Sequence, residues 1–253
     1  MIPIALTVAG SDPSGGAGLQ ADLKTFHQFG VYGQAVVTLI TVQNTLGVTA
    51  VHALNPALVL AQLEAVLADM RPGAMKTGAL GSDDLIQSLT TAAPSWDIPL
   101  VLDPVLFSKN GTRLTSADPR PLFPYAALIT PNLAEASALS GRPVTTVPEM
   151  HDAARALEQQ GAESVLVKGG HLEGDTSVDT LLHRGNFTDF PAPRIATQHT
   201  HGTGCTYSAA ITALLACGLD LPTAVSRAKA YITEAIRTAP GLGHGQGPVN
   251  HWA

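Results

Sequence analysis

Residues 2–29 read IPIALTVAGSDPSGGAGLQADLKTFHQF. The first part, Ile2 to Val8, is short, apolar and rich in β-branched residues, which is typical of a buried strand. A glycine-rich loop follows, and Leu19 to Phe29 then carries apolar residues at three- and four-residue spacing, which predicts a helix. A strand, a glycine loop and a helix in this order are typical of a parallel α/β sheet.

The same alternation continues along the chain. Further strands are predicted at 35–42, 74–77, 100–103, 127–130 and 164–168, and helices at 56–69, 83–92, 132–139, 147–160, 205–216 and 221–238. Two short strands at 179–183 and 186–190, joined at Arg184-Gly185, predict an antiparallel hairpin at a sheet edge. The expected fold class is α/β, with a mostly parallel central sheet and helices on both faces. No repeat or linker interrupts the pattern, so residues 1–253 are expected to form a single domain.

Composition and charge exclude several classes of protein. The formal net charge of -6 and the absence of a basic run argue against nucleic acid as a partner. The longest apolar stretch, around Ala209 to Cys217, is much shorter than the roughly 20 residues of a membrane-spanning helix. The N-terminal residues lack the basic start and long apolar core of a signal peptide. With only two cysteines and no disulfide framework, we expect a protein of the reducing cytoplasm.

Two glycine-rich segments can approach a ligand closely. The first, Ala9 to Gly18, follows a strand and opens a helix, so its backbone N–H groups can face a polar ligand; the alternative is a tight turn. The second, Thr200 to Thr206, reads THGTGCT and precedes a run of small helix-forming residues. A phosphoryl group can sit at such a helix N-terminus, and the alternative is a helix start with small caps.

Cys205 stands at the start of that helix. The helix dipole is expected to acidify its thiol, which could then accept a proton from a substrate hydroxyl group. The alternative is a small buried apolar residue, the role expected for Cys217.

Polar residues also follow three predicted strands. Asp103 and Lys168 each end a strand, and Asn132 and Glu135 begin the next helix within the sequence TPNxxE. Ligands of open α/β sheets bind at the carboxyl ends of strands, so these groups are candidates for binding Mg²⁺ and phosphates. The alternatives are a helix cap for Asn132 and Glu135 and a solvated strand end for Lys168.

Together these motifs resemble the hydroxymethylpyrimidine and phosphomethylpyrimidine kinases of thiamine biosynthesis, within the ribokinase-like superfamily. The resemblance covers nearly the whole chain. Its most specific motifs are AGSDxSGGAGxQADLK (9–24), QNT (43–45), DPV (103–105), TPNxxE (130–135), VKGGH (167–171) and THGTGCT (200–206).

The resemblance implies a ribokinase-like three-layer sandwich and a dimer. It also implies two successive ATP-dependent phosphorylations, first of 4-amino-5-hydroxymethyl-2-methylpyrimidine and then of its monophosphate, with ATP and Mg²⁺ as the cofactors. The residues that it places in the site are Gln43, Asp22, Ala17 and Gly10 for the pyrimidine; Cys205, Gly202, Thr203, Gly204 and Lys168 for phosphoryl transfer; Asn132, Lys168 and Thr200 for ATP; and Asp103 and Glu135 for the metal. Most ribokinase-like enzymes have an aspartate where Cys205 stands, whereas this family has cysteine.

One departure from the family pattern concerns the pocket. The family often reads KIGML where residues 76–80 here read KTGAL, so Ala79 replaces a methionine. A pyridoxal or pyridoxine kinase on the same fold is therefore one alternative. A non-catalytic nucleotide or pyrimidine sensor is another, and the retention of Cys205 and Glu135 argues against it.

Overall fold

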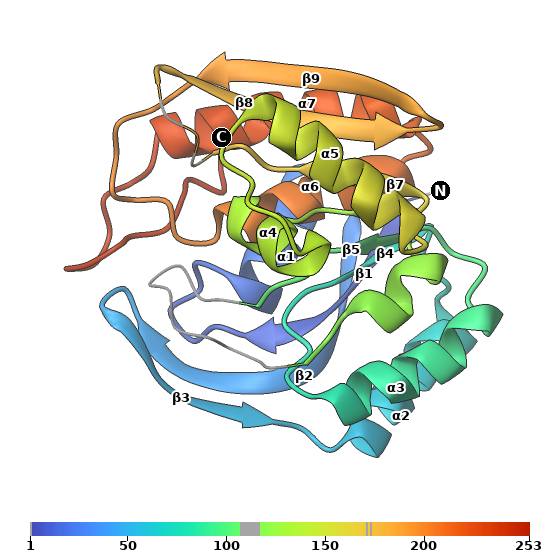
Figure 1. The fold of residues 1–253 in the computed structure, drawn as a ribbon. Helices are drawn as coiled ribbons and strands as arrows, with labels where there is room; N and C mark the ends of the chain where they lie inside the picture. The colour runs from blue at the N-terminus through green and yellow to red at the C-terminus, as the bar shows by residue number, and fades with distance from the viewer. Residues whose placement is uncertain (1, 107–116, 171, 173) are drawn as a thin grey trace.

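The computed structural model describes residues 2–106, 117–170, 172 and 174–253. Within these residues, nine strands form one sheet in the order β3-β2-β1-β4-β5-β6-β7-β8-β9 (Figure 1). The strands are β1 (Ile4–Ser11), β2 (Tyr32–Asn44), β3 (Gly47–Ala53), β4 (Ala74–Thr77), β5 (Leu100–Leu102), β6 (Leu128–Ile129), β7 (Ser164–Val167), β8 (Thr176–His183) and β9 (Asn186–Pro193).

The six neighbouring strands β2, β1, β4, β5, β6 and β7 run parallel to one another. At both edges of the sheet the strands pair antiparallel. At one edge β8 pairs with β9 across a two-residue turn, in which Arg184 and Gly185 both have positive φ, 51° and 75°. Such a turn matches the twist of a hairpin. The mostly parallel sheet with an antiparallel edge hairpin confirms the prediction from sequence.

The strand β3 is not predicted by the sequence pattern. It pairs antiparallel with β2 at the opposite edge, and none of its residues is fully buried. A strand without a buried face has no strict apolar alternation, so periodicity alone does not reveal it. Its partner β2 is 13 residues long, Tyr32–Asn44, and therefore extends beyond the predicted 35–42.

Helices cover both faces of the sheet. The helices α1, α6 and α7 pack on one face and α2, α3, α4 and α5 on the other (Figure 1). Along β5, Leu100 and Leu102 join the core beneath α2 to α5, while Val101 joins the core beneath α6 and α7. This period-two alternation buries both faces of a parallel strand, and it confirms the three-layer sandwich.

The helices are α1 (Gly18–Gln28), α2 (Pro56–Asp69), α3 (Asp83–Ala92), α4 (Leu133–Ser140), α5 (Val147–Gln159), α6 (Thr203–Ala216) and α7 (Leu221–Arg237). The two short 3₁₀ turns in the described residues are Ala93–Ser95 and Arg120–Tyr125. Over the described ranges, no helix combines the length and apolarity needed to cross a bilayer. The parallel strands all end at one edge of the sheet, where α1, α4 and α6 begin, and this arrangement positions the site.

Candidate active site

A cavity of about 750 Å³ lies at the carboxyl ends of the parallel strands. Its wall includes every site residue predicted from sequence except Asp22: Gly10, Ala17, Gln43, Asp103, Asn132, Glu135, Lys168, Thr200, Gly202, Thr203, Gly204 and Cys205. These residues come from both glycine-rich segments and from four other regions of the chain. The fold therefore brings together motifs that lie far apart in sequence. His171, the last residue of the VKGGH motif, lies outside the described residues.

The start of α6 forms one wall of the cavity. Gly202 precedes the helix with φ 78°, and a Cβ atom there would lie 1.8 Å from the carbonyl oxygen of Gly16. Only glycine fits this contact between the two glycine-rich segments. No side chain caps α6, so N–H groups of its first turn are available to an anion.

A partly buried cation, Lys168, faces this helix start. Lys168 Nζ donates to Asp103 Oδ1 at 2.9 Å, and a Cβ atom on Gly204 would lie 3.2 Å from the same Nζ. Burial alone would lower the pKa of Lys168, but the nearby Asp103 and Glu135 raise it above its usual range. The ammonium group therefore stays charged beside the place where a phosphoryl group would meet α6.

Asp103 holds Lys168 in place through their ion pair. Its Oδ1 also accepts from Thr130 Oγ1 at 3.0 Å, and its Oδ2 accepts from Ser208 Oγ at 3.3 Å. Burial opposes ionisation, yet Lys168 and Lys76 hold the pKa of Asp103 below its usual range. Both carboxylate oxygens are thus engaged by protein donors.

Asn132 and Glu135 form the cap of α4. Asn132 Oδ1 accepts from Glu135 N at 2.9 Å, and Glu135 Oε2 accepts from Asn132 N at 2.9 Å. The capping alternative is therefore correct for these residues, although both also line the cavity. Burial raises the pKa of Glu135 to about 7, with Lys168 opposing the shift.

The described residues contain no cluster of three or more His, Cys, Asp or Glu side chains that could hold a metal ion. Mg²⁺ in phosphoryl-transfer sites needs fewer protein ligands, because waters and substrate phosphates complete its shell. Glu135 and Asp103 on the cavity wall can each supply such a ligand, and both carboxylates already accept hydrogen bonds from the protein.

Cys205 lines the cavity, but its thiol is not acidified. The residue as a whole is partly exposed, yet loss of water around the thiol raises the pKa of Cys205 to about 11. Lys76 opposes this shift, whereas Asp22 and Asp103 add to it. The expectation of an acidified thiol is therefore wrong, because desolvation outweighs the positive end of α6.

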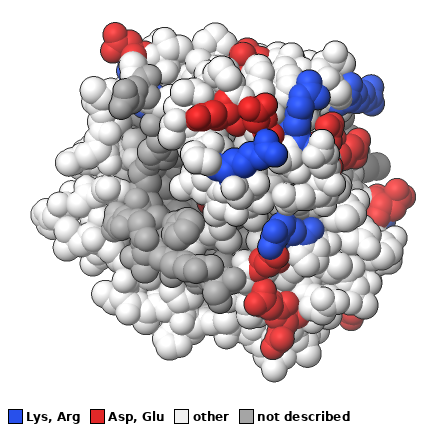
Figure 2. All heavy atoms as spheres, viewed as in Figure 1, with Lys and Arg blue, Asp and Glu red and all other residues white. Residues whose placement is uncertain are grey.

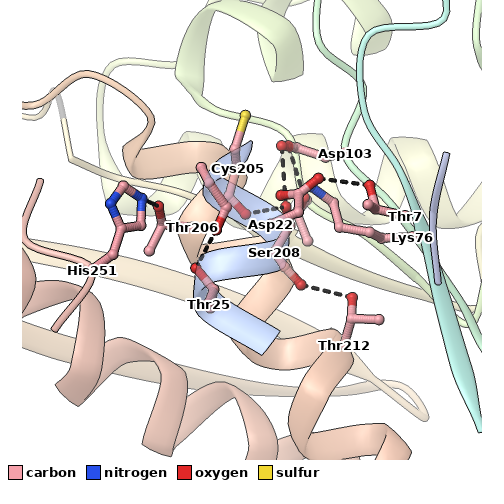
Figure 3. Close-up of polar contacts among 12 residues, drawn as sticks. Thr7, Asp22, Thr25, Lys76, Asp103, Cys205, Thr206, Ser208, Thr212 and His251 are labelled. Carbon is pink, nitrogen blue, oxygen red and sulfur yellow. Dashed lines mark hydrogen bonds and ion pairs between the residues drawn. The ribbon is translucent and has the colours of Figure 1, made fainter. Parts of the chain in front are cut away.

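Asp22 lies beneath the cavity wall and does not line it. Its Oδ1 accepts from Lys76 Nζ at 2.7 Å and its Oδ2 accepts from Thr7 Oγ1 at 2.6 Å. Figure 3 shows the side chains of Asp22, Lys76 and Asp103 gathered near Cys205 at the start of α6. The structure thus places Asp22 in a buried ion pair beneath the cavity and not on its wall.

The link between Asp12 and His201 has no counterpart in the sequence analysis. His201 Nε2 lies 2.8 Å from Asp12 Oδ2, which also accepts from Ala17 N at 2.8 Å. Burial opposes ionisation, but His201 and Gln43 hold the pKa of Asp12 well below its usual range. Asp12 Oδ1 accepts from Ser14 N, a local turn that the sequence DPS signals. The contact with His201, 189 residues away, carries no local signal.

The sequence pattern also does not predict the end of the cavity that α6 and α7 line. Tyr207, Ile232 and Ile236 provide an apolar wall from α6 and α7. Lys229 Nζ donates to Asp179 Oδ2 at 2.7 Å on the same wall. Helix periodicity places such residues on a buried face but does not show that the face borders a cavity.

A parallel sheet covered by helices on both faces, a glycine-rich helix start and a partly buried lysine at the strand ends define a small-molecule kinase of the ribokinase-like class. The fold is shared with the pyridoxal kinase of Bacillus subtilis solved with ADP, at a TM-score of 0.92 and 37% identity over 99% of this chain and 98% of that one. It is shared also with the phosphomethylpyrimidine kinase of Clostridium difficile 630, at a TM-score of 0.81 and 41% identity over 92% of this chain and 99% of that one.

The chain belongs to the phosphomethylpyrimidine kinase family, whose model matches residues 12–250. The hydroxymethylpyrimidine/phosphomethylpyrimidine kinase of Rhizobium meliloti is 45% identical over 260 residues, 100% of this chain and 98% of that protein. The thiamine biosynthesis bifunctional protein of Geobacter sulfurreducens is 47% identical over 97% of this chain, which spans only 51% of that longer protein.

Proposed function

We propose that this chain transfers the γ-phosphoryl group of ATP to the hydroxymethyl group of 4-amino-5-hydroxymethyl-2-methylpyrimidine, and then phosphorylates the monophosphate to the diphosphate. The observation that carries the proposal is the shared cavity, in which Gln43, Lys168 and Cys205 line one continuous wall. Membership of the family supports it, because relatives from Rhizobium meliloti and Haemophilus influenzae have names for both kinase activities.

The pyrimidine occupies the end of the cavity bounded by Gly10, Ala17 and Gln43. An amide offers both a donor and an acceptor, which suits a ring with an amino group beside a ring nitrogen. Gln43 also lies close enough to Asp12 to help lower the pKa of that carboxyl group.

The nucleotide occupies the opposite end, along Asn132, Thr200 and the apolar wall of Ile232 and Ile236. Its γ-phosphoryl group lies between Lys168 and the first turn of α6, and Gly202, Thr203 and Gly204 surround the developing charge. Most of the catalysis then comes from positioning and from charge neutralisation.

Glu135 on the cavity wall would hold Mg²⁺ together with the phosphates of the nucleotide. The ion would supply neutralisation of the charge on the phosphates. Asp103 holds Lys168 in place through the 2.9 Å ion pair.

Cys205 meets the substrate hydroxymethyl group at the point of attack. Because the pKa of its thiol is about 11, Cys205 is protonated at neutral pH, so little thiolate is available to act as a general base. A loose phosphoryl-transfer transition state needs little help in removing the proton. The role of Cys205 is therefore mainly to position the hydroxyl group over α6.

A pyridoxal or pyridoxine kinase is the second candidate, and Ala79 is the observation that favours it. Ala79 lines the cavity, where a longer side chain would narrow the substrate end. The solved structure of the Staphylococcus aureus pyridoxal kinase, with AMP-PCP and pyridoxal, has a TM-score of 0.91 and 36% identity.

A coupled assay of ADP release, with hydroxymethylpyrimidine and pyridoxine measured in parallel, tests these functions. Release that depends on the pyrimidine supports the proposal. Release that depends on pyridoxine alone would assign the second candidate. Nucleotide binding without any product would make the chain a sensor.

We also propose a homodimer formed through the β2–β3 edge. The exposed apolar side chains there are Ile40 at 48%, Val42 at 52%, Leu46 at 66% and Val51 at 36% exposure. Residues 25–63 contain no Lys, Arg, Asp or Glu, and Figure 2 shows no charged side chain over this lower-left part of the face. An uncharged apolar patch of this kind suits a second copy. Light scattering of the wild type and of Val42→Glu tests it, and an unchanged mass would contradict it.

We infer further that residues 1–253 act as one kinase domain in the cytoplasm. One continuous sheet links the two ends of the cavity, and both cysteines are free thiols. Limited proteolysis that releases a stable fragment would contradict the single domain.

A further inference from the structure

The tail that follows α7 runs between the two ends of the cavity. On one side it contacts Thr45, two residues beyond Gln43 at the turn after β2. Gln246 N donates to Thr45 O at 2.9 Å, and Gly245 N donates to Thr45 Oγ1 at 3.2 Å. Both main-chain and side-chain oxygens of Thr45 are therefore bound by the tail.

Close approach of the tail to Thr45 requires glycine. A Cβ atom on Gly245 would lie 2.2 Å from Thr45 O, and one on Gly243 would lie 2.4 Å from Thr45 Oγ1. Gly243 also has φ 83°, a conformation that L-residues rarely adopt. Any side chain at either position would push the tail away from the hairpin.

On its other side the tail contacts the segment before α6. His201 N donates to Gly247 O at 3.1 Å, and Val249 N donates to His201 O at 3.3 Å. Gly247 N also donates to His199 Nδ1 at 3.2 Å. The same His201 is bound to Asp12 in the first glycine loop and directly precedes Gly202.

From these contacts we infer that residues 243–249 are a strap that fixes the distance between the β2–β3 hairpin and the start of α6. The inference rests on the proposed function, in which Gln43 on the hairpin holds the acceptor and α6 receives the phosphoryl group. Two groups that must meet in one transition state benefit from a fixed separation, and small displacements are costly. Gly243, Gly245 and Thr45 are positioning residues in this arrangement, since none of them lines the cavity.

The strap is tested by Gly243→Ala with Gly218→Ala as its matched control. Gly218 has the same φ of 83°, but nothing lies within 4 Å of its added Cβ atom, and it is remote from the cavity wall. Both variants carry the backbone strain, and only Gly243→Ala disturbs Thr45.

We expect Gly243→Ala to raise the KM for the pyrimidine and lower kcat, with a combined loss of about 10- to 100-fold in kcat/KM. The KM for ATP should stay within about twofold in both variants, because Gly243 contacts Thr45 on the hairpin, whereas Gly247 and Val249 make the contacts with His199 and His201 beside Thr200. Amide hydrogen exchange should become faster over 43–48 and 245–247 in Gly243→Ala only. The inference would be overturned if Gly243→Ala and Gly218→Ala changed kcat/KM and hydrogen exchange equally, or if Gly243→Ala raised the KM values for the pyrimidine and for ATP equally.

A second set of three variants avoids glycine altogether. Thr45→Val removes the acceptor for Gly245 N, Thr45→Ser keeps it, and Thr49→Val removes a hydroxyl group that bonds only within the same hairpin. Only Thr45→Val should raise the KM for the pyrimidine, and Thr45→Ser should restore it. Failure of Thr45→Ser to do so would reject the role of the hydroxyl contact. If the wild type phosphorylates no pyrimidine, the proposed function fails, while hydrogen exchange still decides whether the strap exists.

Discussion

Lys76 Nζ lies 2.7 Å from Asp22 Oδ1, and neither side chain has any exposed surface. The pair sits in the layer beneath Cys205, between β4 and α1. Burial disfavours both charges: it raises the pKa of Asp22 although Lys76 opposes the shift, whereas Asp22, Cys205 and Asp103 raise the pKa of Lys76 above its usual range. The 2.7 Å contact between the two groups indicates that they form an ion pair. The pair is thus a buried ionic unit under the reacting end of the cavity.

Breaking this pair should be costly. Asp22→Asn leaves the Lys76 ammonium group buried without its counter-charge, so we expect a loss of about 3–5 kcal/mol in the free energy of unfolding. The double variant Asp22→Leu with Lys76→Met removes both charges and should be more stable than Asp22→Asn. Urea unfolding of the three proteins measures the difference. A double variant less stable than Asp22→Asn would show that the uncompensated charge of Lys76 is not the main cost of breaking the pair.

The thiol of Cys205 should react slowly at neutral pH. Because desolvation raises its pKa to about 11, the thiolate is scarce until the pH approaches that value. The alkylation rate by iodoacetamide should therefore still be rising above pH 9. Cys217 is exposed and supplies the internal comparison once labelled positions are mapped by mass spectrometry. A plateau for Cys205 near pH 7 would contradict the raised pKa.

Cys205→Ser should lose little activity if positioning is its main role. General-base loss typically costs on the order of 10²–10⁴-fold, and we expect the first phosphorylation to fall by no more than the low end of that range. The second phosphorylation, whose acceptor already carries negative charge, should fall less. Separate rates with the alcohol and its monophosphate measure this. A loss near the upper end in the first step alone would restore the general-base role.

Glu135 should control the acid side of the pH profile. Burial raises its pKa from 4.5 to about 7, so the carboxylate is lost as the pH falls through about 7 and not through the ordinary range. We expect kcat/KM for ATP with Mg²⁺ to decline below pH 7. Glu135→Gln should lack this decline and require more Mg²⁺. An unchanged profile and Mg²⁺ requirement would reduce Glu135 to its capping bond with Asn132.

Gln43→Leu should impair the pyrimidine and not the nucleotide. Loss of the amide leaves polar groups of the ring unpaired, which costs roughly 10- to 100-fold in affinity. The KM for ATP should be unchanged, because Gln43 lies at the opposite end of the cavity from Ile232 and Ile236. A rise in the KM for ATP alone would place Gln43 at the nucleotide end of the cavity and contradict its assignment to the pyrimidine.

The sequence by itself determined the helices, every strand except β3, and the part of the cavity wall at the carboxyl ends of the parallel strands. Period-two and period-3.6 apolar patterns report which face of an element is buried, and the order of elements along the chain then selects a parallel sheet. Site residues such as Lys168 and Gly202 were predictable because the carboxyl ends of parallel strands meet at one edge. The strand β3 was not, since it has no buried face to leave a pattern.

Only the tertiary structure decided which groups of the site are charged and which long-range contacts hold them in place. Position at a helix N-terminus predicts an acidic Cys205, but the pKa depends on how much water the surrounding chain removes. Asp22 is polar and close in sequence to the first loop, yet Lys76, 54 residues away, draws it beneath the wall. The contacts of His201 with Asp12 and of the tail with Thr45 join residues about 190 to 200 positions apart. Such contacts follow from packing in three dimensions, and no local pattern of residues encodes them.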